Sequence, residues 1–566
     1  MREICHIDIN AGKLAAWSKT VTGCPPGLEG EDTNGDSIWK ADLPADQRGI
    51  KVLGAPLGSP EYIQKFCDDV VTEKAKLLDL IPKLPSLQAS WLLLYFCAVP
   101  RINHLLRNVP PQHTQVLART HDTNVLRCFR EIFQIPTAAQ WDPNLHGMSY
   151  GTWVQQARLP LRLGGCGLRN STRTSHAAYW ASWADCMPDL VRRFPHMRQD
   201  MVREVAYLQT LDADTLHDGT DCLVAAEHAG KWCQQRGWRE RSLWIDIANG
   251  MRPPEPNRSN DNLGEWQHGW QFHASSPAET TAWQALLQDL APAGARRNAA
   301  TVGKARLYSC MGAFSAVWLT VCPSTEALAI SNLHLQCAMR RRLGIAIGFE
   351  GDDVHGHAAL TDNRWARLNI RHNLLVAAWR QILVEAGASI PDRNVERMLY
   401  RTNPPVAPED LRRLDLVAPG LNVCRGLPLF CDVTVLSPIT ATGVARPGTS
   451  NQGGRLLTNA EADNNDIYWD VTSTGLGELL CLGCEVYGRW SRQCVDLVPK
   501  LARERTRGLH VRVRRGIALS LQHRWWGILG LALQKSVAHI VLSSSAGVDL
   551  VTTGLEPTPA VGDLPA

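Results

Sequence analysis

The hairpin pattern in residues 412–436 constrains the fold more than any other part of this sequence. Two apolar runs, Leu414–Val417 and Leu427–Leu436, flank a loop that is rich in glycine, proline and asparagine. Apolar runs separated by turn-forming residues are typical of two antiparallel strands joined by a loop. The sequence therefore predicts a β-hairpin at this point.

Each predicted strand carries one aspartate, Asp415 and Asp432. Opposed residues of an antiparallel pair have numbers with a constant sum, and the loop Pro419–Pro428 is centred midway between the two aspartates. If the loop closes symmetrically, the two residues face each other with Cβ atoms about 4.5–5.5 Å apart, where like charges repel. A divalent cation such as Mg²⁺ would explain the pair, because it prefers carboxylate oxygens. The alternative is a register shifted by one or two residues, with both aspartates solvated at a sheet edge.

The same region resembles the restriction-like endonuclease of site-specific non-LTR retrotransposons. The resemblance rests on LDLV at 414–417, on CDVTV at 431–435, and on the tripeptide Arg-His-Asn at 371–373. In that family an RHN-type motif opens a helix, and the two acidic strands of a PD…(D/E)xK nuclease fold follow it. The resemblance implies a Mg²⁺-dependent DNA endonuclease.

A helix is predicted around the RHN motif. The apolar residues of Ile370–Ala386 share one face, and Gly387 would end the helix. His372 and Asn373 would lie in its first turn, where a helix favours anions, and a capping or packing role for His372 is the alternative. The implied catalytic residues are Asp415, Asp432, His372 and Asn373, with Asp415 and Asp432 as the metal ligands.

The sequence departs from the family pattern at the position of the family's lysine. That lysine polarises the attacking water and lies on the following helix, four residues before a tyrosine. Here Asn464 stands four residues before Tyr468, and the neutral Ile467 occupies the second basic position. Leu414 also replaces the usual proline before the first aspartate. Because asparagine supplies no positive charge, we expect DNA cleavage to be weak or absent.

Two patches near the start of the sequence resemble the late palm of a reverse transcriptase. Ile7–Trp17 resembles a motif whose lysine would be Lys13, and the turn Leu53–Gly58 resembles the primer-grip hairpin. A glycine-punctuated hairpin lets the backbone approach a nucleic-acid strand closely. The family's [YF]xDD box does not occur in residues 1–50, so we expect reverse transcription to be absent and the sequence to begin after the polymerase active site.

Helical spacing dominates the next part of the sequence. Apolar residues recur every three to four positions through Val70–Leu84 and Leu87–Leu106, which predicts the helices of a polymerase thumb. The segment Leu159–Cys186 then resembles the LGGxGLR segment that follows the thumb in these elements. Arg162 and Arg169 flank its glycines and are candidate phosphate contacts, and a purely structural turn is the alternative.

A zinc knuckle usually precedes the RHN motif in this family, but its ligands are incomplete here. Between residues 337 and 373 only Cys337, His355 and His357 remain as candidate ligands, and structural zinc needs four. The C-x₂-C segment Cys481–Cys484 is also incomplete, so no zinc is expected. The basic run Arg340–Arg342 is expected to be a solvated helix face, with phosphate contact as the alternative.

The strongest electrostatic signal for nucleic acid lies in residues 500–515. This stretch has seven basic residues and one acidic residue, Glu504, and such asymmetry indicates DNA or RNA binding. A solvated helix face is the alternative. The candidate nucleic-acid contacts of the whole sequence are Lys13, Arg162, Arg169, Arg371, Lys500, Arg503, Arg505, Arg507, Arg512, Arg514 and Arg515.

Composition limits the compartment and the class. The 566 residues suffice for several domains, and the net charge of +4 is too small to identify a partner by itself. The 17 cysteines form no disulfide framework, which indicates reduced thiols in the nucleus or cytosol. The longest apolar stretches are short or interrupted by charge, so we expect a soluble intracellular protein without a membrane segment.

The predicted fold class is α+β and mostly helical. The predicted units are a late-palm remnant (1–60), a helical thumb and post-thumb segment (61–200), a helical connector (201–330) with a linker at 251–277, a small α/β restriction-endonuclease-like domain (331–470), a basic helical region (471–546) and a disordered tail (547–566). The function predicted is that of a retrotransposon-derived protein that binds nucleic acid, with nicking weak or lost. The alternatives are a non-catalytic nucleic-acid-binding module and a decayed remnant with no selected role.

Overall fold

The structure is a computed structural model. It describes residues 14–546 apart from residue 22 and residues 217–220, 255–268, 291–296, 348–352, 362–366, 391–396, 403–405 and 476. Lys13 and the predicted tail lie outside the described residues, as does most of the predicted linker. The end of that linker is helical, because α12 (Trp270–Asp289) begins within it.

The first part of the fold is a hairpin followed by helices. Strands β1 (Gly49–Val52) and β2 (Ala55–Gly58) pair antiparallel, so the predicted primer-grip turn is a hairpin. The helices that follow are α2 (Pro60–Leu80), α3 (Leu87–Leu93), α4 (Asn103–Asn108) and α5 (Pro111–Phe133). The helical spacing predicted through Leu87–Leu106 is divided between two α-helices. A π turn and a 3₁₀ turn separate α3 from α4 around Pro100, because proline lacks the amide proton that a continuous helix needs.

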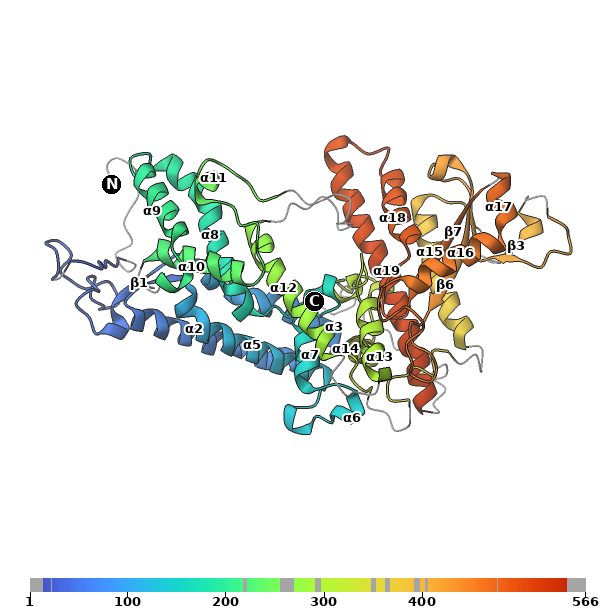
Figure 1. Ribbon diagram of the computed structural model, residues 1–566, viewed down its shortest axis with the longest axis horizontal. Helices are drawn as coiled ribbons and strands as arrows, with labels where there is room; N and C mark the ends of the chain where they lie inside the picture. The colour runs from blue at the N-terminus through green and yellow to red at the C-terminus, as the bar shows by residue number, and fades with distance from the viewer. Residues whose placement is uncertain are drawn as a thin grey trace.

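A second group of helices packs around one tryptophan. Its members are α8 (Ser171–Arg193), α9 (Arg198–Thr210), α10 (Cys222–Gln235), α11 (Trp244–Ala248) and α12, whereas α7 (Tyr150–Ala157) packs in the main core. Trp180 on α8 is fully buried and makes ring contacts with Trp238, Trp244 and Trp270. These helices form a satellite core at the end of the molecule opposite the sheet (Figure 1).

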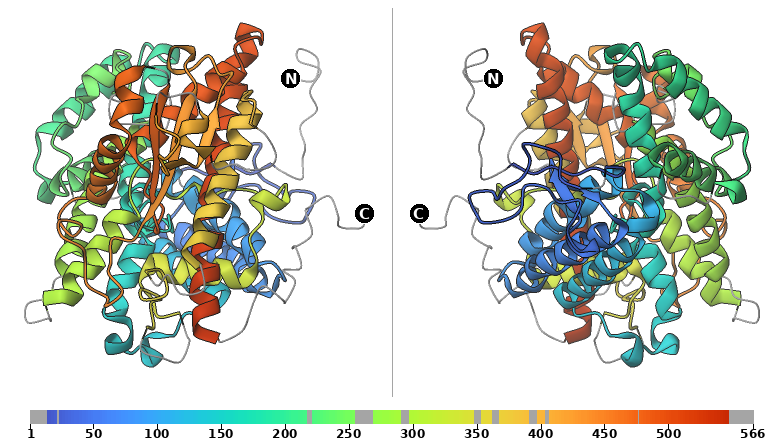
Figure 2. Two further views of the ribbon diagram at one scale, coloured as in Figure 1. Left: turned by 90° about the vertical axis from the view of Figure 1, so that its right-hand side faces the viewer. Right: turned by 90° about the vertical axis from the view of Figure 1, so that its left-hand side faces the viewer.

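The C-terminal part combines a small sheet with several helices. The helices are α13 (Arg297–Ser309), α14 (Asn332–Leu343), α15 (Arg367–Ala386), α16 (Arg455–Ile467), α18 (Arg492–Arg505) and α19 (Val511–Ala546), with the short α17 (Trp469–Thr474) after α16. The sheet has the order β5–β6–β7, where β5 (Leu416–Ala418) is antiparallel and β7 (Glu478–Glu485) is parallel to the central β6 (Leu429–Leu436). The left view of Figure 2 looks onto this end of the molecule and shows the strands in orange. A two-residue pair, β3 (Arg397–Met398) with β4 (Arg413–Leu414), lies beside it.

The two faces of the sheet pack differently. Leu480, Leu482 and Cys484 alternate along β7 and belong to the main core, together with residues of α15, α18 and α19. Leu479 and Phe430 point the other way and pack with Tyr468 and Val471, at the end of α16 and in α17. Alternation of side chains along a strand produces this division. The sheet is therefore covered on both faces.

Helix α19 is the longest helix and lies mostly inside the protein. Among the described residues it is the one helix whose length and composition would allow it to cross a membrane, over Val511–Ser544, and 72% of its most apolar window is buried. Trp525 and Trp526 are fully buried in the main core. Such burial is typical of the core helix of a soluble protein.

The described chain is mostly helical with small sheets, as the predicted α+β class requires. The main core is continuous from Leu78 on α2 to Leu542 on α19. Helices predicted as thumb and the sheet predicted as nuclease thus share one interior. The finer division into palm, thumb, connector and nuclease stays a prediction.

Candidate functional site

The hairpin forms in the register that the loop predicts. Leu416 pairs with Cys431 and Ala418 with Leu429. Asp415 lies at a bend immediately before β5, between β4 and β5. It is close enough to Asp432 for its charge to raise the pKa of that carboxyl. The Asp415 Oδ2 atom also accepts a hydrogen bond of 2.7 Å from the backbone amide of Val433, which fixes the carboxylate onto β6.

The RHN tripeptide reaches the aspartates, but not from a helix terminus. Helix α15 begins at Arg367, three residues before the predicted start, so His372 lies beyond the first turn, where the helix terminus no longer acts on it. His372 instead donates from Nε2 to Asp415 Oδ2 at 3.0 Å, and its Nδ1 lies 3.3 Å from Asn373 Oδ1. The bond to Asp415 raises the pKa of His372 to about 9. The imidazole is therefore charged at neutral pH and forms an ion pair with Asp415.

Arg371 was expected to contact nucleic acid, but its side chain is buried inside the protein. The residue is 6% exposed, and its guanidinium donates to the carbonyls of Leu360 and Val435, each at 3.2 Å. These bonds tie α15 to β6. Because the guanidinium is buried and bonded to protein carbonyls, the nucleic-acid contact predicted for Arg371 is not available in this structure.

Asn464 lies next to Asp432, at the position where the resemblance places a lysine. Its Nδ2 atom donates to Asp432 Oδ2 at 2.7 Å, and Thr434 Oγ1 donates to the same oxygen at 3.1 Å. Burial and the nearby charge of Asp415 raise the pKa of Asp432, while the bonds from Thr434 and Asn464 and the charge of His372 oppose that rise. The Asp432 carboxylate thus has neutral donors where the family pattern has a cationic one.

Two further oxygen atoms on α16 are buried and have no donor. They are Asn464 Oδ1 and Glu461 Oε1, which lie three residues apart and hence on the same helix face. An unsatisfied buried acceptor destabilises a fold by about 1–3 kcal/mol. The sequence reasoning missed Glu461, although its spacing from Asn464 on an amphipathic helix was a usable signal.

These residues fit a hard divalent cation with few protein ligands. Asp415 and Asp432 supply carboxylate oxygens, and the two unsatisfied oxygens lie on the helix that contacts Asp432. Mg²⁺ typically takes one or two carboxylates and keeps several waters. Within the described ranges no group of three or more histidine, cysteine or acidic side chains is arranged to hold a metal. With so few protein ligands, the site would hold a divalent cation only weakly.

The C-x₂-C segment is part of the sheet. Cys481 and Cys484 lie three residues apart on β7, so their thiols project from opposite faces. Burial raises the pKa of Cys481 to about 12 and that of Cys494 well above its usual value. These thiols are protonated core groups at neutral pH, and their geometry does not bring them together around one ion.

The two arginines of the post-thumb turn have unequal exposure. Arg162 forms an ion pair of 2.8 Å with Glu279 and packs on the ring of Phe272 at 5.3 Å. Its charge is therefore neutralised within the protein, which argues against the predicted phosphate contact. Arg169 is exposed.

The predicted basic stretch forms an exposed surface, which we call the basic turn. It comprises the end of α18, the connection, and the start of α19, at the upper edge of the molecule in Figure 1. Glu504 accepts from Asn422 at 3.0 Å and lies 3.9 Å from Arg507. All of its basic side chains are exposed: Lys500, Arg503, Arg505, Arg507, Arg512, Arg514 and Arg515.

Comparison with known proteins adds no relative. No protein-family model matches the chain, and no curated protein matches it.

Proposed function

We propose that this protein derives from a retroelement, binds nucleic acid, and retains a restriction-like nuclease site at which cation-dependent cleavage is weak or lost. One observation carries the proposal: Asp415 and Asp432 lie close enough for their charges to interact, and each is hydrogen-bonded to a residue that the resemblance independently assigns to the site. These residues are His372 for the first aspartate and Asn464 for the second.

The chain's own residues would divide the work as follows. Asp415 and Asp432 would hold Mg²⁺, which when bound lowers the pKa of a water or stabilises a leaving oxygen. Charged His372 positions Asp415 and, with Asn373, offers hydrogen-bond donors at the edge of the site. Asn464 donates a hydrogen bond to Asp432, but it supplies no positive charge to polarise the attacking water. The predicted result is a site that binds its ion and cleaves slowly.

The basic turn supports nucleic-acid binding, which does not depend on cleavage. Residues 500–515 contain seven exposed basic side chains and a single acidic residue. Contacts of this kind neutralise phosphates and release counterions, so affinity falls steeply as salt rises. A non-catalytic module that binds through this surface is the second candidate function. Reduced buried thiols favour an intracellular location for either candidate.

A plasmid-nicking assay with Mg²⁺ or Mn²⁺ tests the cleavage proposal. Wild-type protein is expected to nick supercoiled DNA slowly or not at all, and Asn464→Lys is expected to raise the rate by at least about tenfold, because one general electrostatic contact of this kind is worth about 1.4 kcal/mol or more. Asp432→Ala should abolish nicking in both backgrounds.

The matched control is Asn465→Lys. Asn465 is the neighbouring exposed asparagine on α16, so this change adds the same charge to the same helix away from the aspartates. It should not alter nicking. Equal nicking by wild type and Asp432→Ala, together with no gain from Asn464→Lys, would rule out the site.

A further inference from the structure

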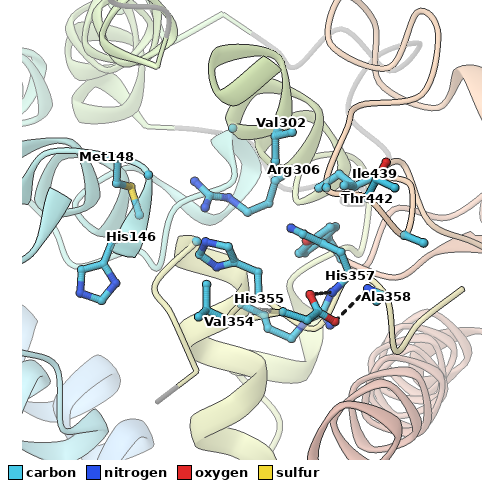
Figure 3. Close-up of a pocket in the computed structure, with 18 of the residues that line it drawn as sticks. His146, Met148, Val302, Arg306, Val354, His355, His357, Ala358, Ile439 and Thr442 are labelled. Atoms are coloured by element: carbon cyan, nitrogen blue, oxygen red, sulfur yellow. Dashed lines mark hydrogen bonds between the residues drawn. The ribbon is translucent and has the colours of Figure 1, made fainter. Parts of the chain in front are cut away.

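A second site lies in a pocket that the cleavage proposal does not use. The pocket has a volume of about 450 Å³ and is enclosed by α13, the end of α14, the loop that follows α14, the loop after β6, and the segment before α7. Figure 3 shows Arg306 and His355 projecting into it from two different segments. None of its lining residues belongs to the Asp415–Asp432 site.

Arg341 is a buried cation whose two terminal nitrogens have no hydrogen-bond partner. It lines the pocket and is 4% exposed. The sequence suggested a solvated run over Arg340–Arg342, and this expectation is wrong for Arg341 and Arg342. Arg340 and Arg342 donate to backbone carbonyls, including those of Phe133 and Gly165. Of the three arginines, only Arg341 has both terminal nitrogens, Nη1 and Nη2, without a hydrogen-bond acceptor.

A second guanidinium lies in the same pocket. Arg306 is 7% exposed, its Nη2 donates to Gln156 Oε1 at 3.0 Å, and its Nε has no partner. Gly344 leaves the space that this side chain occupies, because a Cβ there would lie 0.9 Å from Arg306 Nη1. The glycine also has a φ of +71°, which other residues rarely adopt. The backbone is thus shaped around the arginine.

The described lining has two arginines and a single carboxylate, so one positive charge is left without a counter-charge. Asp353 is its one carboxylate, and both of its oxygens accept backbone amides, from His357 at 2.7 Å and Ala358 at 2.8 Å (Figure 3). Tyr487 lies under Arg341 with its ring centre 5.1 Å away, and burial raises the pKa of its phenol, which stays neutral.

The histidines of the pocket do not change its net charge. Burial and the nearby arginines lower the pKa of His355 to about 4 and that of His357 to about 2. Both rings are therefore neutral at physiological pH, and His357 Nδ1 is buried without a partner. The pocket is positively charged and has unused polar groups, which is costly unless an anion enters.

We propose that the Arg306–Arg341 pocket binds a small phosphorylated ligand of the mononucleotide class. The planar guanidinium fork matches phosphate oxygens better than any other side chain. The volume falls within the range of pockets for small molecules, and the apolar wall of Met148, Leu290, Val302 and Ile439 exceeds what a bare phosphate needs. The His355 and Tyr487 rings suit stacking against a heterocycle.

The test measures ligand binding to the full chain by isothermal titration calorimetry and by thermal shift. The probes are nucleoside monophosphates, the matching nucleosides, inorganic phosphate, and a single-stranded oligonucleotide. Monophosphates are expected to bind and raise the melting temperature, nucleosides are not, and phosphate is expected to bind more weakly.

Arg341→Met is the main variant, because it removes the charge and keeps much of the volume. It is expected to weaken monophosphate binding by at least about tenfold and to raise the melting temperature of the ligand-free protein, since an uncompensated buried charge is lost. A variant that merely misfolds would lower that temperature. Arg492→Met is the control, because Arg492 has a side chain that is 90% exposed and lies outside the pocket.

Val302→Phe is a second variant that leaves both arginines in place. It narrows the pocket and should reduce monophosphate binding while leaving phosphate binding unchanged. Absence of monophosphate binding at millimolar concentration, or equal binding by wild type and Arg341→Met, would overturn the proposal. Oligonucleotide binding that requires Arg341 without any monophosphate binding would overturn it in favour of a strand-binding groove.

Discussion

Raising the pH from about 7 to about 9 is expected to tighten divalent-cation binding at Asp415 and Asp432. In the ion-free protein His372 donates to Asp415 Oδ2 at 3.0 Å, and this bond raises the pKa of the imidazole to about 9. A cation that binds Asp415 competes with the imidazolium for the same oxygen and the same negative charge. Binding should therefore displace the proton from His372.

The size of the effect follows from proton linkage. If one proton leaves for each ion bound, the association constant rises up to about tenfold per pH unit. Between pH 7 and the His372 pKa of about 9 this amounts to about a hundredfold, or about 2.7 kcal/mol at 1.36 kcal/mol per unit. Above pH 9 the affinity should level off, because His372 is already neutral there.

Calorimetric titration with Mn²⁺ measures both the affinity and the proton count, when it is repeated in buffers with different ionisation enthalpies. His372→Gln should flatten the pH dependence while retaining ion binding, and Asp432→Ala should remove the binding. An affinity that stays constant over this pH range in wild type, or a slope that survives in His372→Gln, would refute the coupling between His372 and the ion.

The folding stability of the ion-free protein provides a control, because it should change with pH in the direction opposite to the ion affinity. The raised pKa of His372 means that the ion pair stabilises the fold fully below about pH 6.5, the unfolded pKa of histidine. That contribution is lost as the pH rises toward about 9, the folded pKa. The ion-free protein should therefore become less stable over the same range in which ion binding becomes tighter, and His372→Gln should show neither trend.

Two further changes test the site and the basic turn. Asp432→Asn should stabilise the ion-free protein by about 1 kcal/mol in urea unfolding, because it removes a buried carboxylate and provides an amide that can donate to the unsatisfied Asn464 Oδ1; destabilisation would contradict this account. Arg512→Gln should weaken DNA binding at low salt and reduce the slope of log affinity against log salt by about one, as measured by fluorescence anisotropy, whereas Arg492→Gln, on the exposed start of α18, should not change the slope.

Local spacing was sufficient to predict the hairpin and its two aspartates. The loop Pro419–Pro428 is symmetric about the point where the chain turns, and the register Leu416 with Cys431 follows from that symmetry alone. The position of Asn464 was also local, because it lies on α16 four positions before Tyr468, the residue that caps that helix. Features set within a hairpin or one helical turn require no knowledge of the rest of the fold.

Features that depend on distant segments were mispredicted. The run Arg340–Arg342 has the composition of a solvated face, yet Arg342 donates to the carbonyl of Gly165, which lies 177 residues away in the sequence. Arg371 belongs to a motif that predicts nucleic-acid contact. Its guanidinium instead bonds the carbonyls of Leu360 on a loop and Val435 on the central strand. No spacing rule within one segment shows that a carbonyl from another segment will lie beside a guanidinium.

The two aspartates are not equally informative about function. Asp415 accepts from the amide of Val433 and pairs with charged His372, so it contributes to folding whether or not the site has a role. Asp432 is partly buried next to a second carboxylate, and both burial and Asp415 raise its pKa, so its charged form disfavours the fold. A residue that stabilises the fold is explained by packing alone, whereas a destabilising carboxylate needs another reason. The case for an ion-binding site therefore depends on Asp432 more than on Asp415, and the comparison of Asp432→Asn in the presence and absence of Mn²⁺ is its most direct measurement.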